Sequence, residues 1–298
     1  MMSSNPTFDP SKVLKAHGKD LGGGFVVNRL LPSAKRQAVG PFIFFDHFGP
    51  VTVKPEDNHD VRPHPHIGLA TLTYLFDGVI LHRDNLGYTQ RIEPGAINLM
   101  IAGSGIVHSE RKPEEQKHET YINHGLQLWI AVPEDKEKIP ASFSHTPASA
   151  IPEISNGDAA IRVLVGSAFG VSSPVPTLSP TLYLDIQLPP NSQWQLPMLA
   201  DEQAIYPIEG DVFVAGETLE SHTMLVIDQE QSISSGERPT RFVLVGGQAL
   251  GRRFMWWNFV ASQKEDIEVA ALAWEAGDGA LGMGQVPGEV ERIPLPKR

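Results

Sequence analysis

Short apolar runs separated by turn-forming residues make up most of this 298-residue chain. Between residues 24 and 140 the runs are rich in Val, Ile, Leu, Phe and Tyr, and clusters of Gly, Pro, Asn and Asp separate them. Many short strands with frequent turn signals are typical of an all-β sandwich or barrel. We therefore predict strands over residues 25–27, 42–45, 71–76, 79–81, 98–101, 126–132, 160–165, 181–188, 204–208, 211–215, 224–227 and 241–245.

The strand pattern is interrupted between residues 146 and 160, where Pro, Ala, Ser, Asn and Gly dominate. A stretch of this composition is typical of a connection between folded modules. We place a domain boundary there and predict two tandem β-barrels, over residues 1–148 and 149–298.

One segment near the C-terminus has helical periodicity. Its apolar residues recur at steps of three and four from Ile267 to Trp274. Ser262 and Glu265 have the spacing of a capping box, and Gly277 is a stop signal. The segment therefore predicts a short helix that packs on the outside of a barrel.

Charge and composition narrow the classes of partner and ligand. The chain has 24 Lys and Arg against 35 Asp and Glu, a net charge of −11, which argues against nucleic acid or an anionic membrane surface as a partner. The sequence contains no cysteine, so any bound metal needs nitrogen and oxygen ligands. Residues 1–15 lack the apolar core of a signal peptide, and the most apolar run, 96–102, is too short to span a membrane. We expect a cytoplasmic protein.

Two pairs of metal-ligating residue types share one spacing: His64 with His66, and His108 with Glu110. In a β-strand, residues i and i+2 project from one face about 7 Å apart, so each pair can converge on one ion. Two such strands facing each other would supply three imidazoles and one carboxylate. This donor set suits a borderline first-row ion, and a six-coordinate ion would keep two positions open for water, substrate or dioxygen. Iron(II) is the first choice, with manganese, nickel, copper and zinc as alternatives.

Prolines and glycines shape the backbone around both pairs. Pro63 and Pro65 alternate with the first two histidines, and each proline holds its neighbourhood extended. Because proline cannot donate to a sheet, we expect this pair at the beginning of a strand or at a barrel mouth. Gly103 and Gly105 allow a tight turn just before the strand of His108.

Other histidines differ in their surroundings. His82 and His124 each adjoin an apolar strand and are candidates for contacts to metal ligands or substrate. Those at positions 17, 59, 118, 145 and 222 lie in polar stretches, where we expect them to be solvated.

Residues 63–68, Pro-His-Pro-His-Ile-Gly, and residues 102–110, Ala-Gly-Ser-Gly-Ile-Val-His-Ser-Glu, resemble the pirin family of the cupin superfamily. Residues 39–42, 46–50, 124–129, 180–185 and 256–260 extend the match. The resemblance covers roughly residues 23–277, and the combination of motifs is specific.

The resemblance implies a bicupin, in which two jelly-roll-like barrels follow each other and the N-terminal one alone holds a metal. It implies His64, His66, His108 and Glu110 as the iron ligands. Two departures from the family pattern are visible. Ala70 stands where the general cupin pattern has a glutamate, and residues 95–100 read Gly-Ala-Ile-Asn-Leu-Met where pirins often read Gly-Asp-Val-Gln-Trp-Met. The second departure changes the polarity of the pocket.

Three functions are compatible with this site. The first is a mononuclear iron-dependent dioxygenase for flavonol or other phenolic substrates such as quercetin, an activity associated with pirin-like proteins of bacteria. In that function Glu110 would be the catalytic base that accepts a hydroxyl proton. The second is an iron-dependent redox-sensing regulator that binds a transcription factor or a metabolic enzyme. The third is a metal that only stabilises the scaffold.

Overall fold

The computed structural model describes residues 7–22 and 24–297, and the chain divides into two compact units. Unit 1 comprises the residues up to His17, Asn28–Phe44 and Ser149–Ala249. Unit 2 comprises Gly18–Val27, Phe45–Ala148 and the residues from Leu250 onward. The chain passes between the units at the expected boundary near residue 148 and also at other points. The C-terminal residues consequently fold with the stretch that contains His64 and His108.

Unit 1 is built on a seven-stranded and a four-stranded sheet with antiparallel pairing. In spatial order, the larger sheet contains β1 (Val13–Lys15), β22 (Thr223–Ile227), β19 (Glu202–Glu209), β24 (Thr240–Gly247), β17 (Thr181–Leu188), β14 (Ala159–Val165) and β13 (Glu153–Asn156). The smaller sheet contains β18 (Gln193–Leu196), β23 (Gln231–Ser235), β20 (Val212–Val214) and β21 (Glu217–Leu219). A further pair is formed by β15 (Ser167–Ala168) and β16 (Val171–Ser172).

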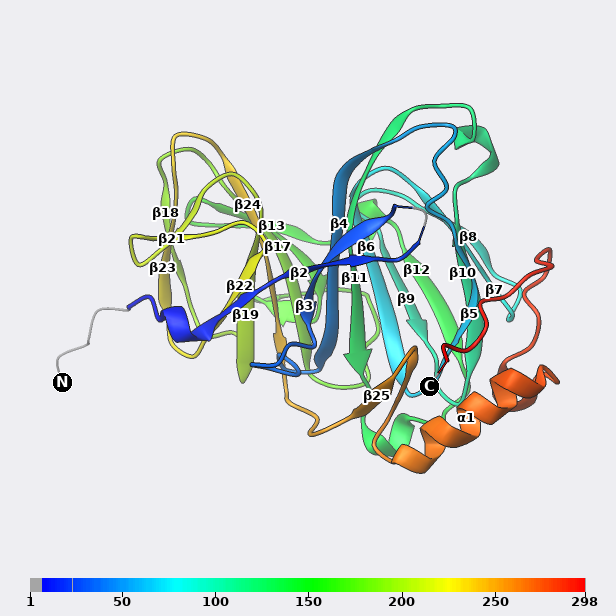
Figure 1. Ribbon diagram of the computed structural model, residues 1–298. Helices are drawn as coiled ribbons and strands as arrows, with labels where there is room; N and C mark the ends of the chain where they lie inside the picture. Colours follow the sequence, from blue (N-terminus) through cyan, green and yellow to red (C-terminus); the bar gives the residue numbers. More distant parts are fainter. Residues whose placement is uncertain (1–6, 23, 298) are drawn as a thin grey trace. The chain divides into compact units, whose positions relative to one another are not determined.

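The strands near the histidine pairs repeat this arrangement, with a seven-stranded and a four-stranded sheet (Figure 1). The larger sheet contains β12 (Ser142–Thr146), β9 (Ile97–Ile101), β6 (Leu69–Asp77), β11 (Tyr121–Ala131), β4 (Phe42–Val53), β3 (Val26–Leu31) and β2 (His17–Asp20). The smaller sheet contains β5 (Val61–His66), β10 (Ile106–Arg111), β7 (Ile80–Asp84) and β8 (Thr89–Ile92). A separate hairpin is formed by β25 (Phe254–Trp256) and β26 (Phe259–Ala261).

One α-helix is present among the described residues, α1 (Lys264–Ala276). Its buried face consists of the predicted apolar residues, which pack with Ile67 and Val107, next to the histidine-bearing strands. The helix ends at Gly277, whose φ of 68° is left-handed, as the stop signal predicted. The predicted capping box is wrong. Gln263 precedes the helix without a side-chain cap, and the hydroxyl of Ser262 donates instead to Glu137 at 2.9 Å.

The residues after α1 lie along the smaller sheet of unit 2. The side-chain amide of Asn85, just after β7, donates to the carbonyl of Gly282 at 2.6 Å, and the backbone N–H of Ile293 donates to the carbonyl of Pro63 in β5 at 2.8 Å. The indole of Trp274 donates to the carbonyl of Ile293 at 3.0 Å. These bonds tie the end of the chain to the strands that carry the histidine pairs.

The all-β prediction of two barrel modules with a short C-terminal helix is confirmed. Short 3₁₀ turns connect some of the strands: Pro10–Lys12, Glu114–Gln116, Glu134–Lys136, Ala148–Ala150 and Ala280–Gly282. Within the described ranges, no helix has both the length and the apolar character that crossing a bilayer requires.

Candidate metal centre

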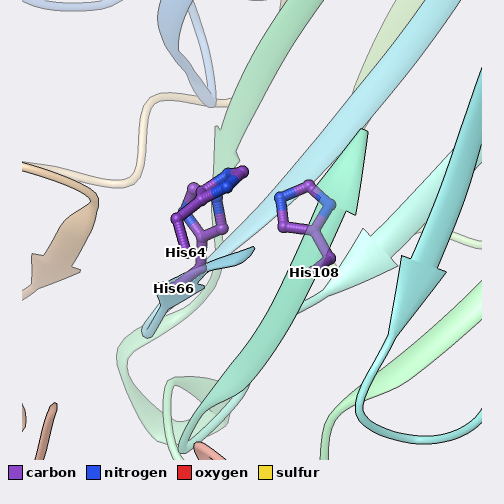
Figure 2. Close-up of side chains that lie close together, drawn as sticks. All are labelled: His64, His66 and His108. Carbon is purple, nitrogen blue, oxygen red and sulfur yellow. The ribbon is translucent and has the colours of Figure 1, made fainter. Parts of the chain in front are cut away.

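The two predicted ligand pairs lie on neighbouring antiparallel strands, β5 and β10. His64 is directly opposite His108, and His66 is opposite Ile106. One ligand atom from each of His64, His66 and His108 lies within 4.8 Å of the other two. Figure 2 shows the three rings gathered between the strands, with the His64 and His108 ring centroids 4.3 Å apart. The i, i+2 spacing within β5 and the pairing of β5 with β10 therefore bring three imidazoles together.

The prolines and glycines help to place these strands, although not entirely as expected. β5 is the edge strand of its sheet, where proline is tolerated because the missing N–H groups cost no ladder bonds. Of the two expected positions, the beginning of a strand is wrong, since β5 ends at His66 and includes Pro63 and Pro65, and the barrel mouth stays a prediction. Gly103 has a φ of 52°, in the left-handed region, and it turns the chain shortly before β10 as predicted.

The outer face of β10 is held by the C-terminal residues. Ser109 and Arg111 alternate along the strand with His108 and Glu110, so they project from the opposite face. The carboxylate of Glu289, which is buried, accepts a hydrogen bond from the Ser109 hydroxyl at 2.7 Å and from the Arg111 guanidinium at 2.5 and 3.1 Å. Burial alone would raise the pKa of Glu289, but these hydrogen bonds and the nearby positive charges outweigh it and lower that pKa. The strand is thereby fixed from behind.

Hydrogen bonds determine which ring nitrogen is available in two of the histidines. Nδ1 of His64 lies 2.9 Å from the carbonyl oxygen of Arg62, and Nδ1 of His66 lies 3.1 Å from that of Asn258. A carbonyl oxygen only accepts, so each Nδ1 must carry the proton and each Nε2 keeps a lone pair. The Nε2 atoms of His66 and His108 are buried, and within residues 7–22 and 24–297 they have no hydrogen-bond partner. Orphaned imidazole lone pairs that converge in this way fit a first-row divalent ion.

Burial keeps the three rings neutral. Desolvation lowers the pKa of His64 to about 4, and it lowers the pKa of His66 and His108 well below 6.5, with further lowering by the neighbouring imidazoles. A neutral imidazole is the form that binds a metal. At neutral pH the cluster can therefore receive a cation without first losing protons.

Glu110, the fourth predicted ligand, lies two residues beyond His108 on β10, opposite His82 of β7. It is not a member of the cluster whose ligand atoms lie within 4.8 Å of one another, among the residues that the structure describes. The pairing of β10 with β5 changes register between His108 and Glu110. Burial raises the pKa of this carboxyl from 4.5 to about 7. Its role as a ligand stays a prediction.

The structure adds two residues behind His108 that the ligand prediction did not include. Nδ1 of His82 lies 3.3 Å from Nδ1 of His108, and Nε2 of His82 lies 3.0 Å from the carboxylate of Asp84. His82 was a sequence candidate for such a contact, whereas Asp84 was missed. The second candidate, His124, pairs instead with His47 through Nε2 atoms 2.8 Å apart.

One face of the larger sheet of this unit also reaches the histidines. A cross-strand row runs over β11, β6, β9 and β12 through Trp129, Thr71, Met100 and Phe143. The Trp129 ring lies edge-on to His66 at 5.2 Å, and Phe143 stacks on His82 at 4.3 Å. The side chains two residues along the same strands form a parallel polar row, which consists of Gln127, Thr73, Asn98 and His145. His145, which was expected to be solvated, is only partly exposed, and its ring bonds the Asn98 amide oxygen at 2.8 Å.

Known proteins share this architecture. Residues 24–130 match the family model described as Pirin, and residues 183–279 match the Pirin C-terminal cupin domain. A pirin-like protein of Caulobacter vibrioides is 43% identical over 270 residues, which cover 89% of this chain and 93% of that protein. Two crystal structures described as quercetin 2,3-dioxygenase from Acinetobacter baumannii are also similar. The first has a TM-score of 0.88 at 32% identity and covers 96% of this chain and 95% of its own. The second has a TM-score of 0.82 at 26% identity and covers 90% and 96%.

Proposed function

The chain belongs to the pirin family, and from that premise we propose that it is a metal-dependent dioxygenase of flavonols or related phenolics such as quercetin. The observation that carries the proposal is the group of three buried imidazoles whose ligand atoms converge within 4.8 Å. The similarity to a structure named quercetin 2,3-dioxygenase, at 32% identity over nearly the whole chain, supports this reaction class.

The proposed ligands are the Nε2 atoms of His64, His66 and His108, with the Glu110 carboxylate as the fourth. We propose iron(II) as the ion, with manganese, nickel, copper and zinc as alternatives for a nitrogen and oxygen donor set. When bound, such an ion supplies a Lewis acid and a template on which substrate and dioxygen meet.

Glu110 has the properties of a base for this reaction. In the metal-free protein its pKa is about 7, so a Glu110 carboxylate that has left the ion can hold a proton at neutral pH. A general base works best when its pKa is close to the working pH. We propose that Glu110 accepts the proton of the substrate hydroxyl and holds it while dioxygen, the oxidant, reacts with the deprotonated ring.

The two rows on the larger sheet suit a phenolic substrate. Trp129 and Phe143 place aromatic surface next to His66 and His82, and aromatic rings pack well against such surface. In the polar row, the buried Nδ2 of Asn98 has no hydrogen-bond partner among the described residues, so a donor is available for a phenolic hydroxyl. We propose that these rows hold the rings that do not react.

Anaerobic titration tests the proposal. Quercetin added to the iron-loaded protein should shift the flavonol absorption band, and admission of air should then give oxygen uptake with decay of that band. His108→Ala should lose both responses. If the wild-type protein shows no shift, the dioxygenase proposal is wrong. Iron binding without turnover of any phenolic would favour the regulatory alternative.

A further inference from the structure

The three imidazoles of the proposed metal site are oriented by two different devices. His64 and His66 donate from Nδ1 to backbone carbonyls. His108 contacts another side chain, His82, which in turn contacts Asp84. We infer that Asp84 and His82 are positioning residues that hold His108 in the tautomer with a free Nε2 lone pair. This inference rests on the proposed metal site. It identifies Asp84 and His82 as the residues that prepare His108 to bind the ion.

The direction of the hydrogen bonds follows from Asp84. Its Oδ1 accepts the backbone N–H groups of Leu86 and Tyr88, both at 3.0 Å, which fixes the carboxylate in the turn after β7. Its Oδ2 lies 3.0 Å from Nε2 of His82. A carboxylate only accepts, so Nε2 of His82 carries a proton, and in the neutral ring Nδ1 of His82 is then an acceptor.

The same logic continues to His108. With Nδ1 of His82 as the acceptor, the contact at 3.3 Å requires Nδ1 of His108 to donate. The second nitrogen of His108, Nε2, then carries a lone pair, and it is a buried atom with no hydrogen-bond partner among the described residues. Imidazole ligands of metals generally donate their other N–H to a fixed acceptor, which sets the tautomer and the ring orientation.

The hydrogen-bonded series of Asp84, His82 and His108, which we call the relay, is buried and tightly packed. Asp84, His82 and His108 are 0%, 3% and 2% exposed, so bulk solvent does not reach these side chains. Asp84 lies directly opposite His108 in the pairing of β7 with β10. The His82 ring is also stacked on Phe143 with an interplanar angle of 16°.

A backbone carbonyl can only accept a hydrogen bond. In the relay, by contrast, a substitution can reverse the direction in which the hydrogen bonds are donated. In Asp84→Asn, the amide oxygen can keep the two backbone N–H bonds, and the amide N–H then faces Nε2 of His82. His82 would become a donor at Nδ1, and His108 would carry its proton on Nε2, where the ion should bind. His82→Gln keeps an acceptor toward His108 and a donor toward Asp84, whereas His82→Phe keeps the ring packing and removes both.

Metal affinity is the first measurement. The metal-free full-length chain and its variants would be titrated with Ni²⁺ and with Co²⁺ in competition with a chromophoric chelator. We expect His82→Phe and Asp84→Asn to bind about 10- to 100-fold more weakly, the range typical of partners behind a metal ligand. His82→Gln should remain close to wild type. The matched control is His222→Phe, which removes a histidine of unit 1 whose ring contacts the Tyr206 hydroxyl, and it should leave the affinity unchanged.

The tautomer itself is read by proton NMR of the Co²⁺-loaded protein. Three exchangeable, paramagnetically shifted Nδ1–H signals are expected in the wild type, one for each imidazole. In Asp84→Asn or His82→Phe, the signal of His108 should disappear or exchange rapidly with water while the other two persist. A general loss of structure would alter all three signals together.

The outcomes separate this inference from the proposed site. Absence of Ni²⁺ and Co²⁺ binding to the wild type would overturn the metal site itself. Tight binding by wild type, His82→Phe and Asp84→Asn alike, with three unchanged Nδ1–H signals, would overturn the positioning role alone. Should His82→Phe fail to fold, the contrast between Asp84→Asn and His82→Gln decides the question.

Discussion

The two four-stranded sheets of this chain have the same kind of framework and different inner faces. In unit 1 the face toward the core carries apolar side chains such as Trp194, Ile233 and Val214. In unit 2 the corresponding face carries His64, His108 and other ionisable groups. Both faces are buried, so the difference lies in side-chain chemistry and not in access to water.

The contrast shows that burying polar side chains at a binding site costs stability, which the fold must offset with hydrogen bonds. An apolar face stabilises the sheet directly, because it removes apolar surface from water. A buried polar face is costly unless its groups are hydrogen-bonded. Unit 2 satisfies the Nδ1 atoms of its imidazoles with carbonyls and with His82, and it leaves the Nε2 atoms of His66 and His108 unsatisfied. Those remaining atoms are where a cation would bind.

The largest expected effect is loss of the ligand that β10 supplies. His108→Ala should weaken binding of a divalent ion by about 100-fold or more, beyond the effect of a supporting residue, because a ligand is removed outright. The measurement is bound metal per chain after dialysis. The control is His222→Ala, which removes an exposed histidine from unit 1. Equal metal content in the two variants would contradict the assignment of the site to unit 2.

A substitution in the apolar core of unit 1 should lower the stability of the protein without changing its metal binding. Leu244 on β24 is fully buried, and Leu244→Ala should lower the free energy of unfolding by roughly 2–5 kcal/mol. Denaturant unfolding followed by tryptophan fluorescence measures this change. Leu244→Met, which conserves volume, should cost less than about 1.5 kcal/mol. Metal content per folded chain should stay constant, and a loss of metal would show that this face also supports the site.

Acid should destabilise the metal-free protein through the histidine face. The pKa of His64 is about 4 in the folded protein and 6.5 when unperturbed. As the pH falls through this window, the unfolded chain binds a proton that the folded chain excludes, so stability present above pH 6.5 is lost. For His64 this difference corresponds to ~3 kcal/mol, and His66 and His108 act in the same direction.

Urea unfolding between pH 4 and pH 7 checks this expectation. Glu110 works in the opposite direction, because its folded pKa is raised to about 7 and its contribution falls as the pH rises from 4.5 toward that value. Glu110→Gln should therefore steepen the loss of stability in acid, and His64→Gln should make it shallower. An unchanged pH profile in both variants would refute the expectation.

The smallest expected effect is the number of protons released when the metal binds. At pH 6 the three imidazoles are already neutral, whereas Glu110 is mostly protonated. If Glu110 is the fourth ligand, metal binding at pH 6 should release about one proton from it. Calorimetric titration in buffers of different ionisation enthalpy gives the number. Glu110→Gln should release almost none, and equal release by both proteins would exclude Glu110 as a ligand.

That His64 and His66 share one face was predictable because the i, i+2 spacing of strands is local information. Their meeting with His108, by contrast, depends on the pairing of β5 with β10, which the family resemblance implied. His82 and Asp84 have the same spacing, but their role depends on Asp84 pairing with His108 across β7 and β10, a long-range register that spacing does not contain. The capping box failed for a similar reason. Ser262 has a stronger distant partner in Glu137, whose carboxylate accepts from both its backbone N–H and its hydroxyl.

Through Glu289, the C-terminal residues support β10, the strand that carries His108. The matched family domain stops at residue 279, ten positions before this carboxylate. A chain shortened to that point would expose the Ser109 and Arg111 side of β10 and free the Pro63 edge of β5, which Ile293 now occupies. Truncation at residue 279 would therefore loosen the support of β5 and β10 from a distance, while every proposed ligand remained in the chain.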